Sequence, residues 1–255
     1  MGFMNKVGVP VAVVAGIAVF LWDDIAPIFG MSNTVDGIST LDEARLAPNW
    51  AAIAGWPGQE ADSLLAPDPK RVTTVIVLDD SGSMGSAMED AKAAVLTAVE
   101  QMPDDGRVAV IALNRGRILD AMAVTDARGT LPQLLQPVEP SGGTPLGASM
   151  FQAFDILTAE AAQQRGFGTY RVLVTTDGQA SDGAALSNAV ERILSRTPIE
   201  VATIGIGIGK GHPLNMPGHM DYVSVSGVDG LAAALTQAAA EQTTFDPVTS
   251  FDEGN

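Results

Sequence analysis

The sequence VTTVIVLDDSGSM at residues 72–84 carries the strongest structural signal in the chain. It begins with apolar and β-branched residues, which are typical of a strand buried on both faces of a parallel sheet. Acidic and hydroxyl side chains follow directly, and Gly82 lets the backbone turn tightly between two serines. Ligands of open parallel sheets bind beyond the carboxyl ends of the strands. The stretch therefore predicts a buried strand that leads into a polar, ligand-binding turn.

Short apolar strands alternate with helical stretches from residue 71 to about residue 243. This alternation predicts an α/β domain with a mostly parallel central sheet and helices on both faces. Periodicity alone does not give the order of the strands in the sheet. We expect strands at residues 72–78, 108–113, 118–124, 171–175, 200–206 and 222–225, and helices at 86–102, 146–162, 184–195 and 231–242.

The overall composition excludes several classes of function. The formal net charge is −16, which argues against nucleic acid or anionic lipid as the main partner, because phosphate binding needs a basic surface. The chain has no cysteine, so disulfides, zinc–thiolate sites and thiol nucleophiles are excluded. Its only histidines are His212 and His219, which leaves little room for a Ser–His–Asp triad or a multi-histidine metal site.

The N-terminal residues 1–22 are expected to form a membrane anchor. Residues 7–22 are an uncharged apolar run of 16 residues, preceded by Lys6 and followed by two aspartates. A spanning helix usually has about 20 residues, so a cleaved secretory signal and a buried helix stay open as alternatives. Because positive charge stays on the cytoplasmic side, the anchor interpretation places the rest of the chain outside the cell membrane.

Two further segments flank the expected domain of residues 71–243. Residues 23–70 are rich in proline and glycine and predict a connector, with one short helix near residues 41–46. Trp50 and Trp56 lie in this connector, where we expect them to pack on the domain, to lie at the membrane surface or to bind a partner. Residues 244–255 are expected to be an acidic, loose tail.

Polar loops that carry oxygen donors follow two of the expected strands, and another such loop leads into an expected helix. Thr144 lies in the glycine-rich loop of residues 141–147, and Asp177 is followed by Gly178 after the strand at 171–175. With the turn after residue 78, these loops offer carboxylates and hydroxyls, which hard divalent cations prefer. The sequence therefore predicts a site for Mg²⁺, with Mn²⁺ or Ca²⁺ as alternatives. The expected ligands are Asp79, Ser81, Ser83, Thr144 and Asp177.

These three motifs, in this order, resemble the von Willebrand factor type A domain with its metal-ion-dependent adhesion site. Met84 after the second serine resembles bacterial members of that family. The resemblance covers about residues 71–243. It implies a Rossmann-like sheet with helices on both faces and one short antiparallel edge strand. It also implies a protein partner whose acidic side chain completes the coordination of the metal.

Other functions fit the same residues less well. A magnesium-dependent phosphohydrolase of the haloacid-dehalogenase kind needs a second acid two positions after Asp79, where this chain has Ser81. A scaffold that does not use the metal site is the other alternative. Asp80 points away from the side of Asp79, so we expect it to be structural or solvated.

The loop at residues 211–221 raises a separate possibility. His212, Met216, His219 and Met220 are donors that could bind copper, although a loop whose methionines cover the edge of the domain is the simpler interpretation. Taken together, the sequence predicts no enzyme. It predicts a single-pass membrane protein of an envelope complex that displays a domain for metal-dependent adhesion to other proteins.

Overall fold

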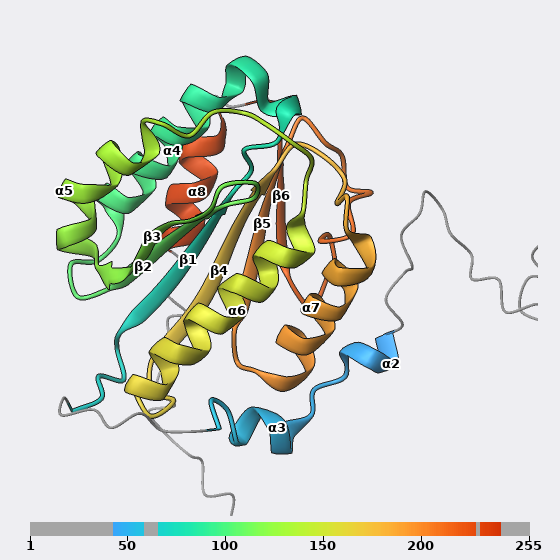
Figure 1. Cartoon of the computed structure of the whole chain (residues 1–255). Helices are drawn as coiled ribbons and strands as arrows, with labels where there is room; N and C mark the ends of the chain where they lie inside the picture. The colour runs from blue at the N-terminus through green and yellow to red at the C-terminus, as the bar shows by residue number, and fades with distance from the viewer. Residues whose placement is uncertain (1–42, 59–65, 228–229, 241–255) are drawn as a thin grey trace, which may run out of the picture. The chain divides into compact units, whose positions relative to one another are not determined.

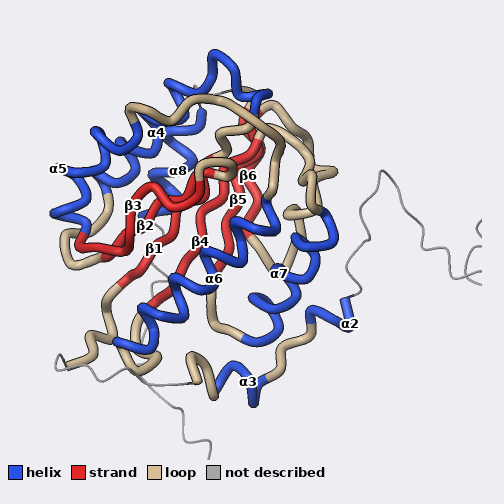
Figure 2. Tube along the Cα trace, in the orientation of Figure 1, coloured by secondary structure: helices blue, strands red, loops and turns tan. Residues whose placement is uncertain are grey.

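The computed structural model describes residues 43–58, 66–227 and 230–240. Its centre is a sheet in the strand order β3-β2-β1-β4-β5-β6, in which every neighbouring pair is parallel except β2 and β3 (Figures 1 and 2). The antiparallel strand β3 lies at one edge, as the family resemblance implied. The strands are β1 (Val72–Leu78), β2 (Arg107–Ala112), β3 (Gly116–Ala123), β4 (Thr169–Thr176), β5 (Glu200–Ile206) and β6 (Asp221–Val225).

Helices cover both faces of this sheet (Figure 1). The short 3-10 helix η2 leads from the turn after β1 into α4, and α4 packs beside α5 and α8 on one face. Helices α6 and α7 pack against each other on the opposite face. The helical bounds are η2 (Gly82–Ala87), α4 (Met88–Gln101), α5 (Val124–Leu135), α6 (Leu146–Gln163), α7 (Gly183–Arg196) and α8 (Leu231–Ala240).

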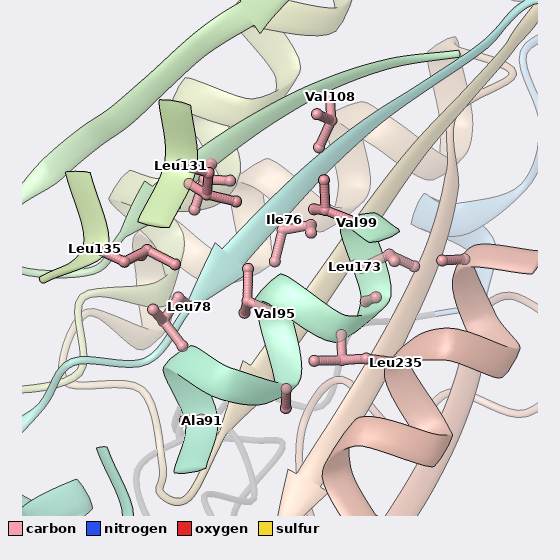
Figure 3. Packing of buried hydrophobic residues seen from close by; sticks show 14 of the residues in the cluster. Ile76, Leu78, Ala91, Val95, Val99, Val108, Leu131, Leu135, Leu173 and Leu235 are labelled. Atoms are coloured by element: carbon pink, nitrogen blue, oxygen red, sulfur yellow. The ribbon is translucent and has the colours of Figure 1, made fainter. Parts of the chain in front are cut away.

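Alternate residues of the central strands feed two separate cores. In β1, Ile76 and Leu78 point toward α4 and α8, whereas Val75 and Val77 point toward α6 and α7. Figure 3 shows the first of these cores, where Val95 of α4 and Leu235 of α8 meet the side chains of the sheet. Since successive strand residues face opposite sides, a strand buried on both faces must be apolar throughout, as the sequence of β1 is.

The structure confirms the predicted α/β sheet but adds helices that the sequence did not predict, the short α3 (Trp50–Ala54) and the longer α5. Helix α5 contains Gly129 and Pro132, which weaken the helical signal in the sequence. It forms because Ala127, Leu131 and Leu135 are buried in the first core, so tertiary packing outweighs local propensity. Pro132 lies in the interior of α5 and has no backbone N–H, so the helix forms without one of its hydrogen bonds.

Part of the predicted connector packs on the domain. The two short helices α2 (Glu43–Leu46) and α3 (Trp50–Ala54) lie in it. Arg45 forms an ion pair with Glu191 of α7, and Leu46 is buried in the second core. Trp56 packs edge-on against Tyr170, with ring centroids 5.0 Å apart, whereas Trp50 is 74% exposed. The predicted domain bounds of 71 and 243 stay predictions.

The predicted membrane anchor, at residues 7–22, and the predicted acidic tail lie outside the described residues. Among the helices that the structure describes, none is both long enough and apolar enough to cross a membrane.

Candidate metal centre

The first two acidic loops meet because β1 and β4 are parallel neighbours. Val77 is paired with Val174 in their register, so Asp79 and Asp177 emerge at the same edge of the sheet. The backbone N–H of Asp79 also donates to Thr175 Oγ1 at 3.2 Å, which joins the two strand ends. The sequence predicted both acidic residues at strand ends, and the strand order makes those ends adjacent.

Asp79 is fully buried, and both oxygens of its carboxylate accept hydrogen bonds. Oδ1 accepts from the backbone N–H of Ser81 at 2.8 Å. Oδ2 accepts from Thr176 Oγ1 at 2.8 Å and from the backbone N–H of Asp177 at 3.2 Å. These donors fix the carboxylate in one orientation.

The hydroxyls of the first turn face the second carboxylate. Ser83 Oγ donates to Asp177 Oδ1 at 2.8 Å, and Ser81 Oγ lies 3.0 Å from Ser83 Oγ and 3.4 Å from the same carboxylate oxygen. Thr144 lies beside the loop that follows Asp177, since its Oγ1 would be 3.8 Å from a Cβ on Gly178. The structure thus brings together four of the predicted ligands, Asp79, Ser81, Ser83 and Asp177, and places Thr144 next to the loop of Asp177.

The charge of the two carboxylates is not compensated by nearby basic side chains. In the described part of the chain, no lysine, arginine or histidine forms an ion pair with Asp79 or Asp177. Burial raises the pKa of Asp177, and repulsion from Asp79 raises it further, whereas the bond from Ser83 opposes this shift. A cation between the two carboxylates would remove their repulsion.

The set of donors suits a hard cation. Nowhere in the described residues do three or more His, Cys, Asp or Glu side chains gather in a metal-binding cluster. The candidate centre instead combines its two acids with neutral hydroxyls, and all of these donors are oxygen. Such a set fits Mg²⁺ or Mn²⁺, which accept few carboxylates and retain some water.

Asp80 and Asn114 hold the first loop against the loop of Thr144. Asp80 Oδ1 accepts from the backbone N–H of Asn114 at 2.7 Å and from its side-chain Nδ2 at 3.1 Å. Nδ2 also donates to Gly143 O at 2.8 Å, and Asp80 O accepts from the N–H of Ser141. Asp80 is therefore structural, as its position predicted, whereas no motif in the sequence pointed to Asn114.

Asp182, in the loop after β4, holds that loop against the start of α6. Its two carboxylate oxygens accept from the backbone N–H groups of Gly147 and Ala148, each at 2.9 Å. The N–H of Ser181 donates to Thr144 O in the same region. A carboxylate at a helix N-terminus satisfies donors that have no partner within the helix. Asp182 was not predicted, because it stands before α7 in the sequence while its carboxylate binds the start of α6, 35 residues earlier.

The loop at residues 211–221 does not offer the predicted copper ligands. Both ring nitrogens of His212 already have partners, since Nε2 lies 3.1 Å from Gly178 O and Nδ1 accepts from the N–H of Leu214. Met220 is buried in the second core, and Met216 packs against that core. The methionines therefore cover the domain, and His219 is the only one of the four possible copper ligands that is exposed.

Comparisons with known proteins agree with this fold. Residues 74–179 match the model of the von Willebrand factor type A domain. No curated protein sequence matches the chain.

Several solved structures have the same fold. A von Willebrand factor type A protein from Catenulispora acidiphila superposes with a TM-score of 0.57 at 21% identity, over 67% of this chain and 42% of that one. Manganese-loaded TRAP protein of Plasmodium vivax gives 0.51 at 16% identity, over 66% and 72% of the two chains. The von Willebrand factor domain of the type V pili tip protein Mfa5 from Porphyromonas gingivalis gives 0.54 at 14% identity, over 68% and 95%. Identities this low show the fold alone.

Proposed function

We propose, on the premise that this chain contains a von Willebrand factor type A domain, that the domain binds one divalent cation and presents it to a protein partner. An acidic side chain of the partner would complete the coordination. The proposed metal ligands are Asp79, Ser81, Ser83, Thr144 and Asp177, and the proposed ion is Mg²⁺, with Mn²⁺ and Ca²⁺ as alternatives.

The observation that carries this proposal is the pair of carboxylates that have hydroxyl neighbours and no basic partner among the residues that the structure describes. Ser83 Oγ and Asp177 Oδ1 are 2.8 Å apart at the edge of the sheet. Ser83 is exposed and Asp177 is partly exposed, so this side of the centre is open to a partner. The manganese-loaded structure of the same fold supports a divalent ion as the probe to try first.

Binding is a better proposal than catalysis. The residue two positions after Asp79 is Ser81, whose hydroxyl cannot act as a general acid at neutral pH. Four carboxylic side chains lie near these loops, and two of them, Asp79 and Asp177, are the proposed metal ligands. Asp80 accepts hydrogen bonds from Asn114, and Asp182 accepts from backbone N–H groups at the start of α6. No carboxyl group near the centre is therefore left to transfer a proton to a leaving group.

We further propose that the domain is displayed on the outer side of a cell membrane, in an envelope complex. The support is the apolar run of residues 7–22, with Lys6 before it and acidic residues after it. Measurement of the intact mass of the membrane-bound protein tests this placement, and a chain that begins beyond residue 22 would contradict an uncleaved anchor.

Calorimetry with the full chain tests the metal centre. We expect wild-type protein to bind one Mn²⁺ or Mg²⁺, and we expect Asp177→Asn to weaken the affinity by about 10–100-fold or more, because a charged ligand is lost. Asp90→Asn is the matched control, since Asp90 is exposed on α4 and the change in net charge is the same. Absence of binding by wild-type protein would contradict the proposal.

Capture of the partner is tested on solubilised membranes with and without EDTA. We expect capture by wild-type protein and by Asp90→Asn, and loss of capture with EDTA or Asp177→Asn. Asp79→Ala is a poorer probe, because it leaves the buried N–H groups of Ser81 and Asp177 without an acceptor. Each such orphan costs about 1–3 kcal/mol of stability, so lost capture could reflect unfolding.

A further inference from the structure

His212 is a buried histidine in the loop between β5 and β6, and it is 3% exposed. Its Nδ1 accepts a hydrogen bond from the backbone N–H of Leu214 at 3.2 Å, which assigns the ring proton to Nε2. Nε2 therefore donates to Gly178 O, 3.1 Å away. Burial lowers the pKa of His212 and so favours the neutral ring that this arrangement needs.

The acceptor of this bond lies directly beside the proposed metal centre. Gly178 follows Asp177, and Thr176 Oγ1 lies 2.8 Å from Asp79 Oδ2 and 3.1 Å from Gly178 O. The hydroxyl of Thr176 has a single proton for these two acceptors. Its shorter contact is to a carboxylate, where a charge-assisted hydrogen bond is about twice as strong as a neutral one.

The imidazole of His212 removes the competition between the two acceptors. Because its Nε2–H satisfies Gly178 O, the proton of Thr176 is free to remain on Asp79 Oδ2. Without that donor, Gly178 O would be left with the hydroxyl of Thr176 as its hydrogen-bond donor. Asp79 would then share the hydroxyl of Thr176 with Gly178 O, and its carboxylate would be held less firmly.

The histidine ring has a rigid support. It stacks on Tyr222 of β6, with ring centroids 6.2 Å apart and an angle of 19° between the planes. The hydroxyl of Tyr222 donates to Gly209 O at 3.0 Å, and Leu214 is fully buried in the second core. Tyr222 also passes so close to β5 that a Cβ on Gly205 would lie 2.3 Å from its hydroxyl oxygen. The ring is therefore held in place from both ends of the loop.

We propose that His212 is a positioning residue of the metal centre, which sets the affinity for the cation through Gly178 and Thr176 without binding the metal itself. This inference rests on the proposed function, because it concerns the same centre. The positioning role depends on the hydrogen bond from His212 to Gly178 O. It does not depend on the bond from Leu214 or on the volume of the ring.

Two amide substitutions separate these contributions. His212→Gln can place an N–H donor near the position of Nε2, so it keeps the bond to Gly178 O and loses the bond from Leu214. His212→Asn can place an oxygen near the position of Nδ1, so it keeps the bond from Leu214 and does not reach Gly178. For Mn²⁺ in calorimetry we expect His212→Gln to stay within about 3-fold of wild type and His212→Asn to bind about 10-fold more weakly, at the lower end of the effect of metal-supporting residues.

Tyr222→Phe is the control for general loosening of the loop. It removes the bond to Gly209 O and leaves the donor to Gly178 O in place, so we expect unchanged affinity for Mn²⁺. The electron paramagnetic resonance spectrum of bound Mn²⁺ gives a second readout, since a less firmly held Asp79 broadens the distribution of metal geometries. Melting temperatures measured without metal show whether each variant is folded at the temperature of titration.

The outcomes distinguish this inference from the proposed function. Wild-type protein that binds no Mn²⁺ contradicts the proposed function itself. If wild type binds Mn²⁺ but His212→Asn binds it equally well, only the positioning role is contradicted. Equal weakening by His212→Asn and His212→Gln, or weakening by Tyr222→Phe, also overturns it, because the bond to Gly178 would then not be the cause.

Discussion

At the scale of single residues, the centre depends on a carboxylate whose proton affinity is raised. Burial raises the pKa of Asp177, with a further contribution from Asp79. A proton and a cation compete for such a group, so its raised pKa brings this competition closer to neutral pH. Without metal, the raised pKa of Asp177 also makes the free energy of unfolding depend on pH. This dependence has the opposite sign from that of an acid whose pKa is lowered by a salt bridge.

We therefore expect the affinity for Mn²⁺ to fall as the pH is lowered toward the raised pKa of Asp177, as calorimetry over a pH series will show. In EDTA, the folded state binds more protons than the unfolded state between the ordinary pKa of Asp177 and its raised value. The stability that Asp177 contributes is therefore present at low pH and is lost as the pH rises through the raised pKa. The difference in unfolding free energy between wild type and Asp177→Asn isolates this contribution, and a pH-independent difference would contradict it.

Gly147 makes a second prediction at this scale. A Cβ at this position would lie 2.2 Å from the backbone nitrogen of Leu186, so α6 and α7 could not approach as they do. We expect Gly147→Ala to lower the free energy of unfolding by about 1–3 kcal/mol, measured by urea denaturation, because backbone atoms must move.

Gly129→Ala is the matched control for that substitution. Gly129 lies within α5, and a Cβ there would have no neighbour within 4 Å. We expect it to raise stability by about 0.5–1 kcal/mol, since alanine has the higher helix propensity. Similar destabilisation by both substitutions would contradict a steric cause at Gly147.

At the scale of elements, the segment before β1 belongs partly to the domain. Trp56 packs edge-on to Tyr170, and its indole Nε1 donates to Thr158 Oγ1 on α6 at 3.3 Å. Trp50, at the start of α3, has no such packing and is 74% exposed. The two tryptophans are alike in the sequence, yet their environments differ.

We expect Trp56→Ala to lower the free energy of unfolding by about 2 kcal/mol, which is less than the loss at a fully buried aromatic position. Trp50→Ala should change it by no more than about 0.5 kcal/mol, as exposed substitutions usually do. Urea denaturation of both variants checks this difference. Equal effects would show that the described packing of Trp56 does not contribute to stability.

At the scale of the whole molecule, the proposed metal binding would be linked to folding. The chain carries a net charge of −16, so uncompensated repulsion works against the compact state. A cation that binds only the folded protein stabilises it by about 2.7 kcal/mol at a free concentration of about 100 times its dissociation constant.

We expect Mn²⁺ at that level to raise the melting temperature by about 5–10 °C and EDTA to reverse the change, as differential scanning calorimetry will show. Sodium chloride at matched ionic strength controls for general screening of the negative charge. The Asp177→Asn variant should show only the effect of screening. A shift of equal size in wild type and in this variant would mean that the stabilisation is not specific to the centre.

The amino-acid sequence was enough to predict the buried strand β1, the alternation of strands and helices, and the five candidate ligands. It could do so because these features are local: a strand buried on both faces must be apolar, and oxygen donors must follow the strand ends if they are to meet beyond the sheet. Helix α5 escaped this reasoning, because Gly129 and Pro132 weaken its local pattern while its packing against the sheet supplies its stability.

The tertiary structure alone decided how the candidate centre is held. Asn114 and Asp80 are 34 residues apart in the chain, Asp182 and Gly147 are 35 apart, and His212 and Gly178 are 34 apart. These bonds exist because the sheet order brings the ends of β2, β1, β4 and β5 to one edge, and no periodic pattern encodes that order. The physical reason is that a hydrogen bond between loops requires both loops to be placed within about 3 Å of each other, which only the packed sheet and its helices accomplish.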